Sequence, residues 1–506
     1  MKPFRGNHAV LSYSLLISAM FILWGVFFNE SLSKLGSSLL KSILDSFGWF
    51  YLVAAGLFLL FTIFLMISRY GNIRLGNDQD QPEYSTLSWI AMLYSAGMGV
   101  GLVFWGVAEP LSHYIHPPMG TGKTVQAAEM AMQYTFFHWG LHPWAIYTVV
   151  GLSLAYFQFR KGMPALISSA FYPLLGNKLY GPIGKTVDVL AVFATVFGVA
   201  TSLGLGTMQI AGGLKHVLGV SSSTTVQVLI IAMLNALYIT SATTGLNRGI
   251  KILSNLNILL AFALMVLLMA VGPTAHIFQI FTTSLGSYLN DIVSMSMRLK
   301  PFEEDTWISG WTLFYWAWWI AWAPFVGTFI ARISRGRTIR EFVMGVLVVP
   351  TLGTFLWFSA FGGSSLYLVH QLGHASLADH AVKDVTTALF EFFQYFPLSP
   401  LMIVLSLVLI ITFFVTSADS ATFVLGMLTS GGSLHPRTGI KMAWGMIQSG
   451  TAVVLLLSNS LSALQTVSIV AALPFCLVMV LMCYSFLKGL QQERTFTENN
   501  KDRKIG

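Results

Sequence analysis

The sequence predicts an all-α membrane protein with twelve transmembrane helices. Composition, the number of apolar segments and the distribution of basic residues lead to this prediction. Of the 506 residues, 55% are hydrophobic and 9% are charged, and the mean hydropathy is +0.70. Soluble domains carry roughly 25% charged residues. The net charge of +8 does not indicate a nucleic-acid partner, because the basic residues follow membrane topology and do not gather on one soluble face.

Twelve apolar segments are each about 20 residues long, which is enough to cross the hydrocarbon core of a bilayer. The first has a basic start but no clear small-residue cleavage site, so we predict that it is retained as a span. The predicted spans cover residues 11–28, 49–68, 87–112, 134–158, 186–213, 225–243, 250–273, 306–331, 341–367, 399–429, 441–458 and 463–487.

The basic residues support this number of spans. With the N-terminus inside, 21 of the 28 lysines and arginines fall in inner loops and tails, as the positive-inside bias requires. A missed or extra span would disturb that alternation. The sequence therefore predicts a multi-pass protein of the cell (cytoplasmic) membrane with both termini cytoplasmic.

The spans fall into two sets of five after an N-terminal pair, and an odd number per set inverts the second set relative to the first. An external connection contains IFQIFTTSLGSYLNDIVSMSM, whose spacing predicts an amphipathic helix along the membrane surface. A second, 370–397, ends in ALFEFFQYF; both could instead be ordinary loops. The predicted parts are 1–86 (tail and spans 1–2), 87–273 (first repeat), 274–305 (external helix region), 306–487 (second repeat) and 488–506 (short cytoplasmic tail).

Each set of five opens with an interrupted helix. Span 3 reads LYSAGMGVGLVFWGVAEP, and Gly97, Gly99 and Gly101 each cost about 1 kcal/mol in a helix interior, so we predict local unwinding. In span 8, Pro324 removes a backbone hydrogen bond and predicts a second break. Paired broken helices in inverted repeats indicate the binding site of a secondary transporter. The alternative is that the glycines only permit close helix packing.

An aromatic cage is predicted beside these breaks. Trp318, Trp319 and Trp322 fall near the middle of span 8 and share one broad sector of the helix. A quaternary ammonium has no N–H to donate, and ring faces stabilise it out of water by about 2 kcal/mol or more. In span 4, Trp139 and Tyr147 are eight residues apart, which predicts one shared helix face. Core packing is the alternative interpretation.

Three neighbouring tryptophans are predicted to lie outside the cage. Trp307 and Trp311 lie near the outer end of span 8 and fit an aromatic belt at the membrane interface. Trp316 lies on a different face from the cage, so we predict that it faces lipid or packs.

Two motifs together identify a family. FYWAWWIAWAPFVGTFIARISRGRTIREF and SAGMGVGLVFWGVAEP resemble the betaine/carnitine/choline transporter family, and the resemblance extends from span 1 to span 12. It implies a sodium-symporter fold of five-plus-five inverted helices with two extra N-terminal spans. It also implies a homotrimer assembled around the 274–305 helix.

The resemblance assigns the substrate site. It implies that Trp318, Trp319 and Trp322 hold the substrate's trimethylammonium group and that Trp139 and Tyr147 form an outer aromatic contact. Four residues of the unwound span 3 would face the substrate and a sodium ion: Ala96, Gly97, Met98 and Gly99. Exposed amides at a helix break suit a carboxylate, and freed carbonyls suit a hard cation.

The resemblance also assigns the coupling ion. One sodium ion would be held by Met98 at the break and by Phe413, Thr416 and Ser417 of span 10. The alternative for the two hydroxyls is a bond to their own helix backbone. A second sodium site would use the residues Thr195 and Phe325. However, Val199 replaces that site's second threonine, which departs from the pattern for two sodium ions.

The function that follows is import of glycine betaine as a compatible solute by sodium symport with alternating access. Proton-coupled choline transporters of the family carry an acid where this chain has Gly101, and sodium-independent exchangers lack the methionine that is present as Met98. Proton-coupled choline uptake and sodium-independent carnitine/betaine exchange remain the alternatives. The tail after residue 487 is short, so strong osmotic gating by it is not expected.

Channel and enzyme functions fit the sequence less well. A channel needs a continuous polar pore, whereas the predicted midplane offers a cage and isolated hydroxyls. The histidines lie mostly in predicted loops and show no metal-binding spacing, so we expect no enzyme, no cofactor and no metal other than sodium. Cys476 and Cys483 are seven residues apart in one apolar segment, too far for a disulfide.

Overall fold

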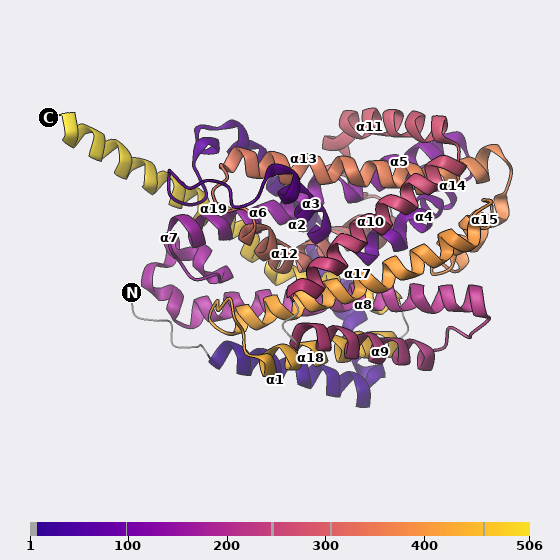
Figure 1. Cartoon of the computed structure of the whole chain (residues 1–506), viewed down its shortest axis with the longest axis horizontal. Helices are drawn as coiled ribbons and strands as arrows, with labels where there is room; N and C mark the ends of the chain where they lie inside the picture. Colours follow the sequence, from indigo (N-terminus) through magenta and orange to yellow (C-terminus); the bar gives the residue numbers. More distant parts are fainter. Residues whose placement is uncertain (1–7, 98, 244–246, 304–305, 459–460, 506) are drawn as a thin grey trace.

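The computed structural model describes residues 8–97, 99–243, 247–303, 306–458 and 461–505. Within these ranges the chain is helical and contains no named strand, with one isolated antiparallel bridge between Arg74 and Thr338. The predicted all-α class is therefore confirmed. Figure 1 shows long helices running mostly along the longest axis, with the first residues of α1 and the distal part of α19 at the same end of the molecule.

Ten helical segments of the described chain are long and apolar enough to cross a membrane. They correspond to predicted spans 1, 2 and 5–12. Their helices are α1 (His8–Phe27), α2 (Asn29–Ile67), α8 (Pro182–Leu218), α9 (Thr224–Thr243), α10 (Asn247–Val271), α12 (Phe314–Arg332), α13 (Ile339–Phe358), α17 (Ser399–Thr429), α18 (Thr438–Leu457) and α19 (Leu461–Ile505).

Predicted span 3 is divided where the glycines predict. Helix α3 (Thr86–Gly97) ends and helix α4 (Val100–Ile115) begins on either side of the glycine motif, with Gly99 in an extended conformation before α4. Each half is shorter than a complete span. The predicted interruption is confirmed.

Span 4 is also divided, which the sequence prediction missed. Helix α5 (Val125–Trp139) ends and helix α6 (Leu141–Ala155) begins around Gly140. A Cβ at Gly140 would lie 2.5 Å from the carbonyl oxygen of Phe136 and 2.9 Å from Cζ of Phe355. The expectation that Trp139 and Tyr147 share one helix face is therefore wrong, because they belong to different helices.

The predicted break at Pro324 is also wrong. Helix α12 continues through Pro324, and its irregular part is a π-helical turn at η5 (Ser309–Leu313). Close packing holds the backbone, because a Cβ at Gly327 would lie 3.0 Å from the backbone nitrogen of Gly151 in α6. Neighbouring helices thereby compensate for the lost hydrogen bond, as they do for other prolines in membrane helices.

The external connections contain helices. Helix α11 (Thr274–Ser296) covers the predicted amphipathic segment, and α15 (Ala375–Lys383) and α16 (Ala388–Phe393) lie in the second connection. Gln133 of α5 donates a hydrogen bond to Asp291 of α11 over 2.7 Å. The backbone N–H of Leu141 donates to the Tyr288 hydroxyl over 3.1 Å. Helix α11 thus docks on both sides of the Gly140 break.

Short helices complete the chain. They are η1 (Arg69–Asn72), η2 (Tyr156–Arg160), η3 (Ile167–Phe171), α7 (Tyr172–Leu175), η4 (Gly176–Tyr180), η6 (Ser359–Gly363), α14 (Ser364–Leu366) and η7 (Tyr367–Gln371). Cys476 and Cys483 are free and buried, as the sequence predicts.

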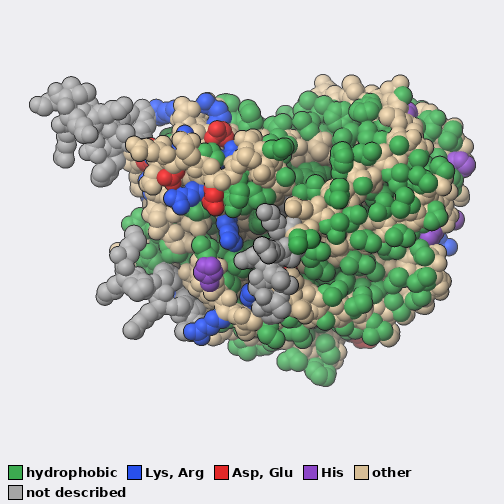
Figure 2. All heavy atoms as spheres, in the orientation of Figure 1, with side chains coloured by type: hydrophobic (Ala, Val, Ile, Leu, Met, Phe, Trp, Pro, Cys, Tyr) green, Lys and Arg blue, Asp and Glu red, His purple; other side chains and the backbone are tan. Residues whose placement is uncertain are grey.

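The surface divides by polarity. Figure 2 shows hydrophobic side chains over much of the molecule and charged side chains gathered at the end where α7 and the distal part of α19 lie. Among the charged side chains, Arg160 pairs with Asp78 over 2.8 Å and also with Glu493 of α19. Arg335 pairs with Asp80 over 3.2 Å. Glu493 thus connects α19 to the segment after α6, and the two aspartates connect the segment after α2 to those after α6 and α12. The composition and the apolar helices define a multi-pass membrane protein.

Candidate functional site

A cluster of buried aromatic rings lies where α12 packs against α6 and α8. The rings of Trp318 and Trp319 are stacked, with centroids 5.1 Å apart and an interplanar angle of 16°. Trp139 stands edge-on to Trp319 at 4.9 Å, and Tyr147 does so at 6.0 Å. Four of the five predicted cage residues therefore meet around Trp319, although they come from three helices.

The glycine motif provides the space that these rings occupy. A Cβ at Gly101 would lie 2.4 Å from Cη2 of Trp318. A Cβ at Gly97 would lie 2.1 Å from Cη2 of Trp144. Real Cβ atoms do not approach other atoms so closely, so any larger residue would have to displace an indole. The glycines thus explain both the break in span 3 and the close approach of the rings.

The fifth predicted cage residue, Trp322, lies slightly apart. Its ring is edge-on to Phe325 at 5.4 Å. A Cβ at Gly99 would lie 3.7 Å from Cη2 of Trp322 and 3.6 Å from Oγ of Ser417. Gly99 therefore brings together the helix break, one cage ring and a predicted sodium ligand.

Each cage tryptophan donates its indole N–H to the protein. Trp322 donates to the Gly198 carbonyl over 2.8 Å, and Trp318 donates to Oγ of Ser202 over 3.2 Å. Trp319 donates to the carbonyl of His138 over 3.0 Å. That carbonyl is in the last turn of α5, where the break at Gly140 removes the usual intrahelical partner. With the N–H groups bonded, the π faces are the part of each ring left for a ligand.

Three of the four predicted ligands of the first sodium ion are described in the structure, namely Phe413, Thr416 and Ser417. Thr416 donates to the carbonyls of Thr412 (2.9 Å) and Phe413 (3.1 Å), and its hydroxyl accepts from Asn257 over 2.9 Å. Its hydroxyl therefore makes the helix-backbone bond considered as the alternative, whereas Ser417 lies beside Gly99. Met98 lies outside the described residues, and of Ala96 only the helical backbone is described.

For the second predicted sodium site, Thr195 and Val199 are buried in α8. The Thr195 hydroxyl donates to the carbonyl of Ala191 over 2.9 Å, and Phe325 contacts the ring of Trp322. These contacts are helix bonding and ring packing, and they leave the second sodium site a prediction.

Two aromatic residues that the sequence prediction omitted also belong to the cluster. Trp144 lies edge-on to Tyr147 at 5.7 Å and fills the space beside Gly97. The Tyr315 ring lies 6.1 Å from that of Trp318 and 6.2 Å from that of Trp319. A signal for Tyr315 was available, because it is three and four residues before these tryptophans and so lies on the same helix face.

Trp316 lies outside the cage, as predicted, and it packs inside the protein. Its ring is fully buried and stacks on His142 with centroids 5.2 Å apart.

A buried carboxylate supports the cage from behind, and this is the main feature that the sequence prediction missed. Oε2 of Glu109 accepts hydrogen bonds from Nε1 of Trp139 (2.7 Å) and from the hydroxyl of Tyr315 (2.5 Å). Oε1 lies 2.8 Å from Nδ1 of His138 and 3.2 Å from Nε2 of His113.

The Glu109 cluster changes one expectation. The ligand atoms of Glu109, His113 and His138 lie within 4.8 Å of one another, so the expectation of no metal-type grouping among the histidines is wrong. The spacing of Glu109 and His113, one helical turn apart, was visible in the sequence; the approach of His138 depends on the tertiary fold. In the structure both histidines lie within hydrogen-bond distance of Oε1 of Glu109.

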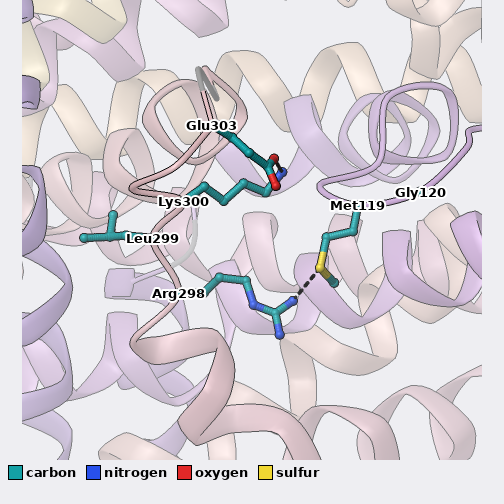
Figure 3. A pocket seen from close by; sticks show the side chains of 6 residues that line it. All are labelled: Met119, Gly120, Arg298, Leu299, Lys300 and Glu303. Carbon is teal, nitrogen blue, oxygen red and sulfur yellow. Dashed lines mark hydrogen bonds and ion pairs between the residues drawn. The ribbon is translucent and has the colours of Figure 1, made fainter.

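A separate surface pocket of 440 Å³ lies between the segment after α4 and the segment after α11. Figure 3 shows Arg298 pointing toward Met119, with a 3.0 Å contact to its sulfur, and Lys300 beside Glu303. None of the residues that line this pocket belongs to the ring cluster.

The long apolar helices define a multi-pass membrane protein, and the family match that follows makes it a transporter and not an enzyme. The chain belongs to the betaine/carnitine/choline transporter family, because the model of the "BCCT, betaine/carnitine/choline family transporter" matches residues 9–495. The resemblance drawn from the two motifs is thereby confirmed.

Curated relatives match over almost their full length. The chain is 53% identical to the glycine betaine transporter OpuD of Bacillus subtilis strain 168, over 94% of this chain and 93% of that protein. It is 45% identical to a probable glycine betaine transporter of Desulfitobacterium hafniense strain Y51, over 97% and 98%. It is also 45% identical to an ectoine/hydroxyectoine transporter of Virgibacillus pantothenticus, over 98% and 99%.

Proposed function

We propose that the protein imports glycine betaine as a compatible solute by sodium symport with alternating access. The cluster of stacked and edge-on rings around Trp319, whose N–H groups are bonded elsewhere, carries this proposal. A trimethylammonium group cannot donate hydrogen bonds, so it is stabilised best by such ring faces. Two of the relatives given above are named as a glycine betaine transporter and a probable glycine betaine transporter, which supports the same substrate class.

The carboxylate of the substrate has candidate partners beside the cage. The backbone between α3 and α4 is interrupted at the glycine motif, and the N-terminus of α4 presents amides and a positive dipole end. The Tyr147 hydroxyl is buried and makes no hydrogen bond with described residues. A zwitterion bound here would place its ammonium group against the ring of Trp319 and its carboxylate at the hydroxyl of Tyr147.

Sodium enters the proposal through Gly99 and Ser417. Freed carbonyls at a helix break and a serine hydroxyl are oxygen ligands of the kind that hard cations prefer. One sodium ion moving down 100 mV supplies about 2.3 kcal/mol, or about fiftyfold accumulation. Val199 removes a hydroxyl from the second predicted site, so the proposal needs the first site only.

The architecture proposed for this function is the one implied by the family. The ten long helical segments and the divided spans 3 and 4 support twelve spans, in two inverted sets of five after an N-terminal pair. In Figure 1 the first residues of α1 and the distal part of α19 lie at the same end of the molecule. This supports two termini on the same side of the membrane, which we assign to the cytoplasm. The proposal also includes a homotrimer in the cell membrane, with α11 at its contacts.

Uptake by the purified protein in proteoliposomes tests the proposal. Labelled glycine betaine should accumulate only with an inward sodium gradient and should saturate. Choline, carnitine and ectoine should be added as competitors, since one similar relative is named for ectoine. Stronger competition by choline together with a proton requirement, or exchange that is indifferent to sodium, would favour one of the two alternative functions instead.

A further inference from the structure

Glu109 is a buried acid that neither the predicted site nor the coupling ion accounts for. Its side chain has no exposed surface, and its two oxygens contact groups from three helices, α4, α5 and the α12 segment. Burying a charged group without an opposite charge is expensive. We therefore expect a carboxylate in this position to have a function that offsets the free-energy cost of burying its charge.

The hydrogen bonds around Glu109 fit an ionised carboxylate, because each of its four neighbours can donate to it. The indole N–H of Trp139 can only donate, so Oε2 is an acceptor. His138 has Thr312 at its other ring nitrogen, 3.0 Å away, and Nδ1 of His113 has no hydrogen-bond partner among the described residues. One N–H of each imidazole can donate to Oε1. No lysine or arginine pairs with Glu109 in the described part of the chain.

This negative charge lies one ring away from the cage. Trp139 donates to Glu109, and its ring centroid is 4.9 Å from that of Trp319. Tyr315 also donates to Glu109 and lies 6.2 Å from Trp319. A ring that donates its N–H or O–H to an anion gains electron density, so its faces become more negative and attract a cation more strongly. The same bonds fix the rings in place.

We propose that Glu109 is a positioning and specificity-determining residue of the cage, which orients Trp139 and Tyr315 and gives the cage its preference for cationic head groups. The proposal rests on the function proposed above, since it assumes that the cage holds a quaternary ammonium. It differs from a purely structural role in one measurable respect: the charge of Glu109 affects a cation and not a neutral group of the same shape.

A matched pair of ligands separates these roles. Glycine betaine and 3,3-dimethylbutyrate share a carboxylate and a head group of similar shape, but the latter has a neutral carbon in place of the ammonium nitrogen. Equilibrium binding to the purified full-length protein should be measured for both. The wild type should bind betaine more tightly. In Glu109→Gln the betaine affinity should fall by about fifteenfold, as expected for a full charge about 10 Å away at an effective dielectric constant of about 20, while that for dimethylbutyrate changes by less than about twofold.

Asp188 provides the control. It is another buried acid, but among the described residues it contacts the backbone N–H (2.9 Å) and hydroxyl (2.8 Å) of Ser168 and no ring. Asp188→Asn should leave the ratio of the two affinities unchanged. An equal fall in both affinities in Glu109→Gln, or the same change of ratio in Asp188→Asn, would overturn the proposal.

Two further outcomes complete the test. If Glu109→Gln does not fold, Glu109→Asp retains the charge and should retain the preference for betaine even where overall affinity drops; loss of preference in a folded Asp variant overturns the role. A wild type that binds neither ligand, or both equally, instead refutes the cage as a cation site and thus the proposed function. A wild type with a clear preference that survives in Glu109→Gln refutes only the role of Glu109.

Discussion

Replacing Trp319 should weaken betaine binding more than replacing any other single ring. Trp319 contacts Trp139, Tyr147, Tyr315 and Trp318, with centroid distances between 4.9 and 6.2 Å. Trp319→Ala removes one ring face worth about 2 kcal/mol to a desolvated cation, which corresponds to about thirtyfold in the dissociation constant. Trp319→Leu keeps much of the volume but no π face, and it should weaken binding to a similar extent.

Trp316 offers a control within the same helix. It has the same side chain and is fully buried, but it stacks on His142 outside the cage. Trp316→Ala should lower thermal stability, since losses for buried tryptophans are about 3–5 kcal/mol, and leave the betaine affinity of the folded protein unchanged. Equilibrium binding of labelled betaine measures both variants. An unchanged affinity in Trp319→Leu, or an equal loss in Trp316→Ala, would show that these rings act by packing alone.

Three further changes test other parts of the site. Gly101→Ala places a Cβ 2.4 Å from Cη2 of Trp318, so it should displace that ring and raise the KM for betaine uptake by at least about tenfold; a normal KM would contradict the tight fit. Tyr147→Phe removes a buried hydroxyl and should weaken betaine binding severalfold while leaving tetramethylammonium binding unchanged, because only betaine carries a carboxylate; equal effects on both ligands would exclude that contact. Ser417→Ala should raise the sodium concentration for half-maximal uptake, whereas Thr422→Ala, whose hydroxyl donates to the carbonyl of Ala418 on the same helix over 2.7 Å, should not; indifference to both would remove Ser417 from the ion site.

Local sequence signals predicted the features that depend on local chemistry. Gly97, Gly99 and Gly101 predicted the interruption in span 3, because glycine destabilises a helix wherever it stands. The composition and apolar segments predicted the all-helical membrane class. The three cage tryptophans were identified from their spacing within one helix, and the ring cluster forms around two of them.

Features set by tertiary packing were predicted poorly. Pro324 predicted a break that the close contact between Gly327 and Gly151 prevents. The break at Gly140 was missed even though Pro143 follows three residues later in the first turn of the next helix, where proline is tolerated. Glu109 was overlooked because three of its four partners lie at least 29 residues away in the sequence.

The position of Gly99, between a ring of the cage and the hydroxyl of Ser417, has a thermodynamic consequence. If both ligands bind around this one residue, the two binding equilibria share a coupling free energy, and that coupling is reciprocal. Sodium must then increase the affinity for betaine by the same factor by which betaine increases the affinity for sodium. A single titration of either ligand at several concentrations of the other therefore measures how strongly the helix break links them.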